Sequence, residues 1–222
     1  MEYKRTISKF NSLLLDLLFP QSKIVSSIGK ASSQELRDKL PKAGRPESKY
    51  DFALFSYQSK RVRALVWEMK YRGNPVFIKK VAEILHEELV YIISEKSPFS
   101  RDCKPLLIPV PTSRARKASR GFNQCELLAM TLQKIDRGNT FDVKADLVKK
   151  IKDTKSQTKI KNKKERLIAP IGSFKVSLPE NIKGKDIIIL DDVITTGATV
   201  GEIRRVLKEA GAKRVWAVAV AH

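Results

Sequence analysis

Apolar and polar positions divide the chain into strand-like and helix-like segments. Short apolar runs typical of buried strands lie at 52–57, 105–111, 174–178, 187–190 and 214–221. Apolar residues recur with the spacing of an amphipathic helix over 7–18, 60–73, 77–94, 123–134 and 199–210. This alternation of strands and helices predicts an α/β fold with a mostly parallel sheet flanked by helices.

Three polar segments interrupt the alternation. Residues 21–49 contain two glycines and two prolines, which predicts a loop or a loosely held segment with a short helix near 33–40. Residues 112–124 carry four basic side chains and no acidic one, which predicts a basic loop. Residues 144–166 hold ten Lys or Arg against three Asp or Glu and are too polar for a core. We therefore expect a small N-terminal appendage over 1–49 and an α/β domain over 50–222.

The clearest chemistry lies where the strand at 187–190 is expected to end. Asp191 and Asp192 follow it, and ligands of parallel sheets bind beyond the carboxyl ends of strands. Carboxylates accept hydrogen bonds from a diol and bind Mg²⁺. Small and hydroxylated residues then lead into a helix whose N-terminus favours an anion: Thr195, Thr196, Gly197, Ala198 and Thr199. The pattern predicts a sugar phosphate site.

A simpler explanation needs no ligand. A helix capped by threonine after a buried strand, with one incidental aspartate, accounts for the same residues. The turn also lacks the Gly-Lys-Ser/Thr of a Walker A loop and the GxGxxG of a dinucleotide fingerprint.

The stretch IIILDDVITTGAT, from Ile187 to Thr199, resembles the phosphoribosyl pyrophosphate (PRPP) motif of type I phosphoribosyltransferases. The resemblance implies that Asp191 and Asp192 hold the ribose hydroxyls and that the turn at 195–199 holds the 5′-phosphate. It also implies that Mg²⁺ accompanies PRPP, with these two carboxylates as candidate ligands. Purine-salvage members carry an aspartate at the position of Thr195 as an acid or base, so no acceptor-activating residue is identified.

Three further stretches are similar to the ComF family, also called ComFC or amidophosphoribosyltransferase-like. They are FNSLLLDLLFP (10–20), YQSKRVRALVWEMKYRGNP (57–75) and IPVPTSRARKASRGFNQCELLA (108–129). The Arg-Gly-Phe-Asn-Gln block within the last is typical of that family. The resemblance implies a type I phosphoribosyltransferase-like fold, and the family name implies natural competence.

The chain also departs from that family. Many members carry four zinc-binding cysteines after the first helix, whereas FPQSKIVSSIGK contains none. We therefore expect a degenerate, metal-free segment there and no zinc. Ala169 stands where the family often carries an asparagine.

Basic side chains supply candidates for binding the pyrophosphate group. Lys70 and Arg72 lie where the family's pyrophosphate loop falls, and Arg114 follows the strand at 105–111. Surface charges that end a helix explain the first two equally well.

Other basic residues are candidates for contact with a nucleic-acid backbone. They are Arg116, Lys117, Arg120, Lys161, Lys163 and Lys164. Tyr57, Trp67, Tyr71 and Phe122 offer surfaces for base stacking, although core packing explains such residues more often. Asn123 and Gln124 are predicted to cap and start a helix, and neither His86 nor His222 is assigned a role.

Charge is the outstanding bulk property of this chain of 222 residues. Its net charge of +20 favours an anionic partner, although a basic surface tuned for solubility is a simpler alternative. No run reaches the roughly 18 apolar residues of a membrane span, and no signal peptide is recognised. Cys103 and Cys125 are too few for a four-cysteine zinc site and predict idle thiols in a reducing cytoplasm.

These patterns predict a cytoplasmic, PRPP-binding, phosphoribosyltransferase-like protein that acts in DNA uptake. Single-stranded DNA and proteins of the competence machinery are its expected partners. The alternative is an active phosphoribosyltransferase that transfers phosphoribose to a small acceptor and has no nucleic-acid role. Turnover stays an open question because no acceptor-activating residue is identified.

Overall fold

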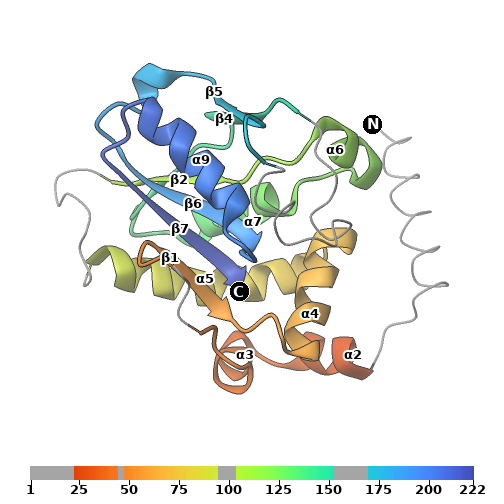
Figure 1. The fold of residues 1–222 in the computed structure, drawn as a ribbon. Helices are drawn as coiled ribbons and strands as arrows, with labels where there is room; N and C mark the ends of the chain where they lie inside the picture. The colour runs from red at the N-terminus through yellow and green to blue at the C-terminus, as the bar shows by residue number, and fades with distance from the viewer. Residues whose placement is uncertain (1–22, 45–47, 95–103, 153–169) are drawn as a thin grey trace.

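A five-stranded parallel sheet lies at the centre of the computed structural model, which describes residues 23–44, 48–94, 104–152 and 170–222. The strands in spatial order are β1 (Asp51–Phe55), β7 (Arg214–Ala221), β6 (Asp186–Val193), β2 (Leu106–Pro109) and β3 (Asp142–Val143). Every neighbouring pair is parallel. The predicted α/β sheet is confirmed, and one edge of it gathers the carboxyl ends of all these strands (Figure 1).

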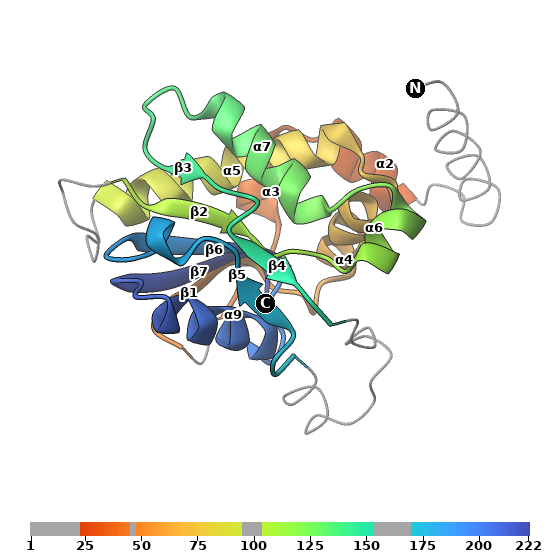
Figure 2. The ribbon, with the colours of Figure 1, turned by 90° about the horizontal axis from the view of Figure 1, so that it is seen from above.

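Helices cover both faces of the sheet (Figure 2). Successive side chains of β6 accordingly point into two different cores. Ile188 and Leu190 lie in a core with α4 (Lys60–Trp67), α5 (Pro75–Ser94) and α7 (Gln124–Ile135). Ile187 and Ile189 lie in a core with α9 (Ala198–Glu209) and the antiparallel pair β4 (Val148–Lys150) and β5 (Phe174–Val176). Burial on both faces explains the unbroken apolar run of this strand.

The polar segment 21–49 contains two helices in its described part, α2 (Lys23–Lys30) and α3 (Ser33–Lys39). A capping box starts α3, in which Ser32 and Glu35 each accept a hydrogen bond from the other's backbone N–H. Ile28 belongs to the same core as α4 and α5, so packing orders residues that the composition predicted as mainly loop. The predicted helix over 7–18 lies outside the described residues, and the division at residue 49 stays a prediction.

The predicted basic loop at 112–124 is largely a helix, α6 (Arg114–Arg120). Ser113 caps it by accepting a hydrogen bond from the Arg116 backbone N–H, and Gly121 ends it with φ +84°. The prediction was wrong because it relied on the repeated positive charge and gave less weight to Ser113 and Gly121, which are ordinary signals of a helix start and a helix end. Asn123 caps α7 as predicted, accepting a hydrogen bond from the Cys125 backbone N–H at 3.0 Å.

Helix α4 continues into one turn of π-helix, η1 (Glu68–Arg72), which ends at Gly73 as predicted. Gly73 has φ +57° and its N–H donates to the Glu68 carbonyl. Single π-helical turns are found frequently at functional sites. Here the turn places Lys70 near the end of β6, where it forms the ion pair with Asp192 that is described below.

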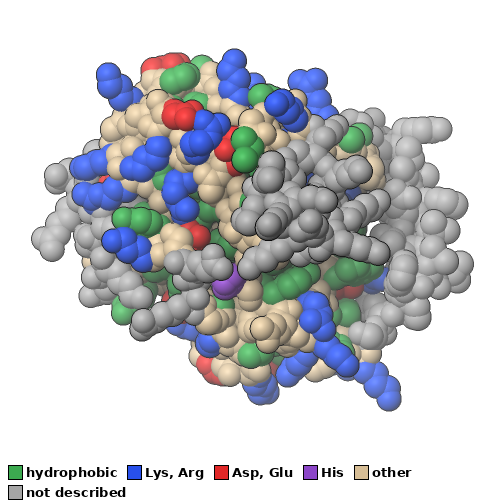
Figure 3. Space-filling view, viewed as in Figure 1, with side chains coloured by type: hydrophobic (Ala, Val, Ile, Leu, Met, Phe, Trp, Pro, Cys, Tyr) green, Lys and Arg blue, Asp and Glu red, His purple; other side chains and the backbone are tan. Residues whose placement is uncertain are grey.

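Positive charge is spread over the molecular surface rather than gathered in one patch on the face seen in Figure 3. Lys161, Lys163 and Lys164 lie outside the described residues, so their predicted contact with nucleic acid stays a prediction. Among the helices of the described ranges, none combines the length and the apolar character that crossing a bilayer requires.

Candidate functional site

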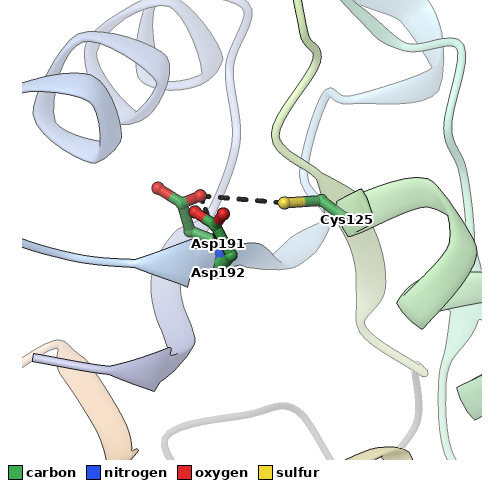
Figure 4. Close-up of side chains that lie close together, drawn as sticks. All are labelled: Cys125, Asp191 and Asp192. Atoms are coloured by element: carbon green, nitrogen blue, oxygen red, sulfur yellow. Dashed lines mark hydrogen bonds between the residues drawn. The ribbon is translucent and has the colours of Figure 1, made fainter. Parts of the chain in front are cut away.

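Both aspartates lie inside β6 rather than after it. The strand pairs with β7 as far as Val193, whereas its pairing with β2 stops at Leu190 opposite Pro109. The expectation that the strand ends at Leu190 is therefore correct only on the side of β2. Asp191 and Asp192 extend past the last residue of β2 and lie beside the first turn of α7 (Figure 4).

Asp192 is held as a charged group by residues from two other elements. The Nζ of Lys70 lies 3.1 Å from its Oδ2, and the Nε2 of Gln124 donates to the same oxygen at 3.0 Å. Burial acts to raise the pKa of Asp192, but the Lys70 ammonium lowers it below its ordinary value. Burial likewise acts to lower the pKa of Lys70, and the charge of Asp192 raises it. The two form an ion pair at neutral pH.

Asp191 has the opposite protonation behaviour. Its Oδ1 accepts a hydrogen bond from the Asp192 backbone N–H at 2.8 Å and lies 3.7 Å from the Sγ of Cys125. Burial, together with the charge of Asp192, raises the pKa of Asp191 to about 8. Burial and the two carboxylates also raise the pKa of the Cys125 thiol. At neutral pH the two aspartates together therefore hold one negative charge and one proton. They can thus both accept hydrogen bonds from neighbouring hydroxyls and donate one to them.

The Arg-Gly-Phe-Asn-Gln block packs against η1. The guanidinium carbon of Arg120 lies 4.6 Å from the centre of the Tyr71 ring, a cation–π distance. A Cβ placed on Gly73 would lie 2.9 Å from the Cζ of Phe122, so the ring packs directly on the glycine. The block therefore holds the segment that carries Lys70.

Gln124 and Cys125 are site residues that sequence reasoning missed. Gln124 was predicted only to start a helix and Cys125 to be idle, yet their side chains contact Asp192 and Asp191. No local pattern marks them. An amide and a thiol on a first helical turn reach the aspartates only because α7 begins beyond the end of β2.

We expect Gly73→Ala to destabilise the protein more than Gly121→Ala. Both glycines have positive φ, which costs a residue with a Cβ about 1–2 kcal/mol. Nothing lies within 4 Å of a Cβ at Gly121, whereas the Cβ at Gly73 meets Phe122 and adds about 1–3 kcal/mol of overpacking. Urea unfolding of the two variants measures the difference. Equal losses would contradict the close packing of Phe122 on η1.

The turn at 195–199 leaves at least one donor, the Thr196 hydroxyl, without a partner among the described residues. Gly197, with φ +69°, is the N-cap residue of α9, and no described side chain caps that helix. The explanation by a threonine cap is therefore wrong. The Oγ1 of Thr196 is buried and, among the described residues, has no hydrogen-bond partner. An anion at the start of α9 would satisfy such groups.

The other basic candidates are placed differently from one another. The side chain of Arg72 is 9% exposed, pairs with Glu68 at 3.5 Å and lies over the Trp67 ring. The side chain of Lys70 is 25% exposed. The explanation of these two as surface charges is therefore wrong. Arg114 is exposed on the first turn of α6. Their role in binding pyrophosphate stays a prediction.

A hollow of about 500 Å³ opens beside Thr195 at the carboxyl ends of β1, β6 and β7. It is lined by Gly44, Ser56, Tyr57, Gln58, Arg63, Ile194, Thr195 and His222. The Nδ1 of His222 lies 2.8 Å from the Ile194 carbonyl, which can only accept, so Nδ1 carries a proton. The hollow has the size of a small-molecule site, and its mainly apolar lining includes several hydrogen-bonding groups.

Comparisons with known proteins agree on one family. The model of the phosphoribosyl transferase domain matches residues 120–222. Competence protein ComFC of Streptococcus pneumoniae is 31% identical over 166 residues, 73% of this chain and 64% of that protein. Competence protein F of Haemophilus influenzae is 32% identical over 117 residues, 51% of this chain and 49% of that protein. The chain thus spans less than two thirds of the length of these relatives.

Two further proteins complete the comparison. DNA utilization protein YhgH of Escherichia coli strain K12 is 31% identical over 151 residues, 68% of this chain and 63% of that protein. A solved structure of hypoxanthine phosphoribosyltransferase from Trypanosoma cruzi covers 65% of this chain and 62% of its own, with 10% identity and a TM-score of 0.38.

Proposed function

Because the chain belongs to the ComFC family and has a type I phosphoribosyltransferase-like fold, we propose that it binds PRPP at the carboxyl end of β6. The observation that supports this best is that two groups suited to different parts of PRPP lie close together along the chain. Asp191 and Asp192 offer an acid and a carboxylate, and the start of α9, which no described side chain caps, follows at Gly197. The first pair suits a diol and the second suits a phosphate.

Each group then has a defined task. Asp191 and Asp192 bind the ribose hydroxyls, and the turn at 195–199 binds the 5′-phosphate. Lys70 leaves Asp192 when the ribose arrives and turns its charge to the pyrophosphate. Carboxylate oxygens fit Mg²⁺, which would be held by the two aspartates and would neutralise the pyrophosphate charge.

Calorimetric titration with PRPP, with and without Mg²⁺, tests this proposal. We expect one site per chain and tighter binding when Mg²⁺ is present. A chain that is folded and shows no heat of binding would overturn it.

We also propose that the protein acts in DNA uptake and binds single-stranded DNA. Relatives named for competence and for DNA utilization support the first part. The exposed side chains of Arg114 and Lys117 on α6, the second of which also pairs with Glu126 at 2.7 Å, and the net charge of +20 support the second.

Replacing Arg114 and Lys117 together by glutamine is expected to weaken binding of a labelled single-stranded oligonucleotide by about tenfold at low salt. The slope of log affinity against log salt should fall by about two, because each removed cation leaves one phosphate without its partner. Lys183 and Lys185, exposed at the opposite edge of the sheet, give the matched control when changed in the same way. Equal weakening by both double replacements would argue against a defined α6 surface.

A second function, transfer of phosphoribose to a small acceptor, is favoured by the hollow beside Thr195. An acceptor held there would lie next to the sugar bound at the aspartates and the turn. Release of pyrophosphate from PRPP, measured with ammonia and with a set of nucleobases as probes, tests it. Release that no probe accelerates would argue for PRPP as a ligand rather than a substrate.

A further inference from the structure

Cys125, Asp191 and Asp192 form a buried cluster of side chains that can each bind a metal ion (Figure 4). One ligand atom from each lies within 4.8 Å of the other two. The Sγ of Cys125 is 3.7 Å from the Oδ1 of Asp191. In a tetrahedral site with Zn–S of about 2.3 Å and Zn–O of about 2.0 Å, sulfur and oxygen ligands are about 3.5 Å apart. This pair already has nearly that spacing.

Gln124 provides an independent observation at the same place. It is 8% exposed, and its Nε2 donates to the Oδ2 of Asp192. Its Oε1 is buried and has no hydrogen-bond partner in the part of the chain that the structure describes. Such an oxygen is costly to leave unpaired. Oε1 and Nε2 are bonded to the same carbon, and Nε2 contacts Asp192, so Oε1 lies near the cluster and rotation of the amide can bring it in as a fourth donor.

We propose that these side chains bind one thiophilic divalent cation, of the class of Zn²⁺ and Co²⁺. A thiolate favours such ions over Mg²⁺, which prefers an octahedron of oxygen ligands. The site uses a single thiolate, so it differs from the four-cysteine ribbon that the N-terminal segment is predicted to lack. On binding, the Cys125 thiol and the protonated Asp191 carboxyl each release a proton to solvent, and the sulfur electron pair forms the metal–sulfur bond, with no change of oxidation state.

Lys70 opposes this cation. Its ammonium lies 3.1 Å from the Oδ2 of Asp192, so it places a positive charge at the edge of the cluster. A divalent ion and this ammonium repel each other across a short distance, and the partly exposed side chain must turn away when the ion binds. Removing the ammonium should therefore strengthen binding.

The cation and PRPP should exclude one another, because both use Asp191 and Asp192. This consequence rests on the proposed function, whereas the cation site itself does not. Binding of such an ion would keep the ribose from its carboxylates.

Titration of the full chain with Co²⁺ tests the site. In a Cys103→Ser background, Cys125 is the single thiol, so a thiolate-to-cobalt charge-transfer band in the near ultraviolet reports on it alone. We expect one Co²⁺ per chain and loss of the band in Cys125→Ser. Asp191→Asn should weaken Co²⁺ binding by at least about tenfold, and Lys70→Met should strengthen it by about the same factor.

A band that survives Cys125→Ser, or no band at any Co²⁺ concentration, would overturn the site. If Cys125→Ser does not fold, the opposite effects of Asp191→Asn and Lys70→Met decide, and equal affinities in both would also overturn it. PRPP with Mg²⁺ is then added to the Co²⁺ complex, and we expect the band to disappear. PRPP that binds by calorimetry and leaves the band intact refutes the exclusion. A stable band without any PRPP binding refutes the proposed function and leaves the cation site standing.

Discussion

Replacing Asp191 and Asp192 together by asparagine is expected to weaken PRPP binding by at least about a hundredfold. A hydrogen bond to a charged group contributes about 1.5–3 kcal/mol, and the single negative charge of the pair can accept two of them, which corresponds to a factor of about a hundred or more. Asparagine keeps the size of the side chain, so the change removes charge and acceptor strength rather than volume. Calorimetry with Mg²⁺ measures the loss.

This experiment needs a background in which Lys70 is not left unpaired. Removing one partner of a buried ion pair typically destabilises a protein by about 3–5 kcal/mol, although the partly exposed Lys70 reduces that figure. The comparison with and without the two asparagines is therefore made both with Lys70 and in Lys70→Met protein, because Lys70→Met alone leaves Asp192 unpaired. Asp136→Asn is the matched control, since the side chain of Asp136 is only 3% exposed and pairs at 3.0 Å with His86. PRPP binding that is unchanged by the double replacement would refute the assignment of the pocket.

Single asparagine replacements at the two aspartates are expected to change stability in opposite directions near neutral pH. The pKa of Asp191 is raised to about 8, so between about pH 4 and pH 8 the folded protein holds a proton that the unfolded chain has lost. Its contribution to stability is therefore full below about pH 4 and falls as pH rises to about 8. One unit of pH is about 1.4 kcal/mol, which sets an upper limit of about 6 kcal/mol. Asn does not titrate, so Asp191→Asn removes this fall in stability with pH. The variant should therefore be more stable than the parent protein at pH 8.

Asp192 behaves in the opposite sense. Its pKa is lowered in the folded protein, so it adds stability above its ordinary pKa and loses it as pH falls through the folded value. Asp192→Asn should therefore destabilise the protein at neutral pH and have little effect in strong acid. Urea unfolding of both variants and the parent between pH 5 and pH 8.5 measures the free energy of unfolding. Curves that run parallel at all pH values would contradict the unequal protonation of the pair.

The sheet could be predicted from the sequence because its central strands carry a local signal. The apolar runs at 187–190 and 214–221 are long enough to be recognised, and burial on both faces makes them continuous. Helix α6 could also have been found, because Ser113 and Gly121 mark its ends. Charge was given more weight there than helix capping, and that choice caused the error.

The surroundings of the aspartates could not be predicted in the same way. Gln124 and Asp192 are 68 positions apart in the chain, and their hydrogen bond depends on where α7 begins relative to β2. The same holds for Lys70, whose direction depends on the π-helical turn rather than on any residue pattern. The residue types were visible in the sequence, but the contacts that shift the pKa of each carboxyl arise only from the fold.

The π-helical turn η1 has a consequence for how such a site can arise. Its hydrogen bonds span one residue more than those of an α-helix, so a segment of this kind can come from insertion of a single codon into a regular helix. Deleting one residue would rotate everything that follows by about 100° around the helix axis. The ammonium that neutralises Asp192 would then face elsewhere. A one-residue length change within Glu68–Arg72 could thus separate relatives that form this ion pair from relatives that do not.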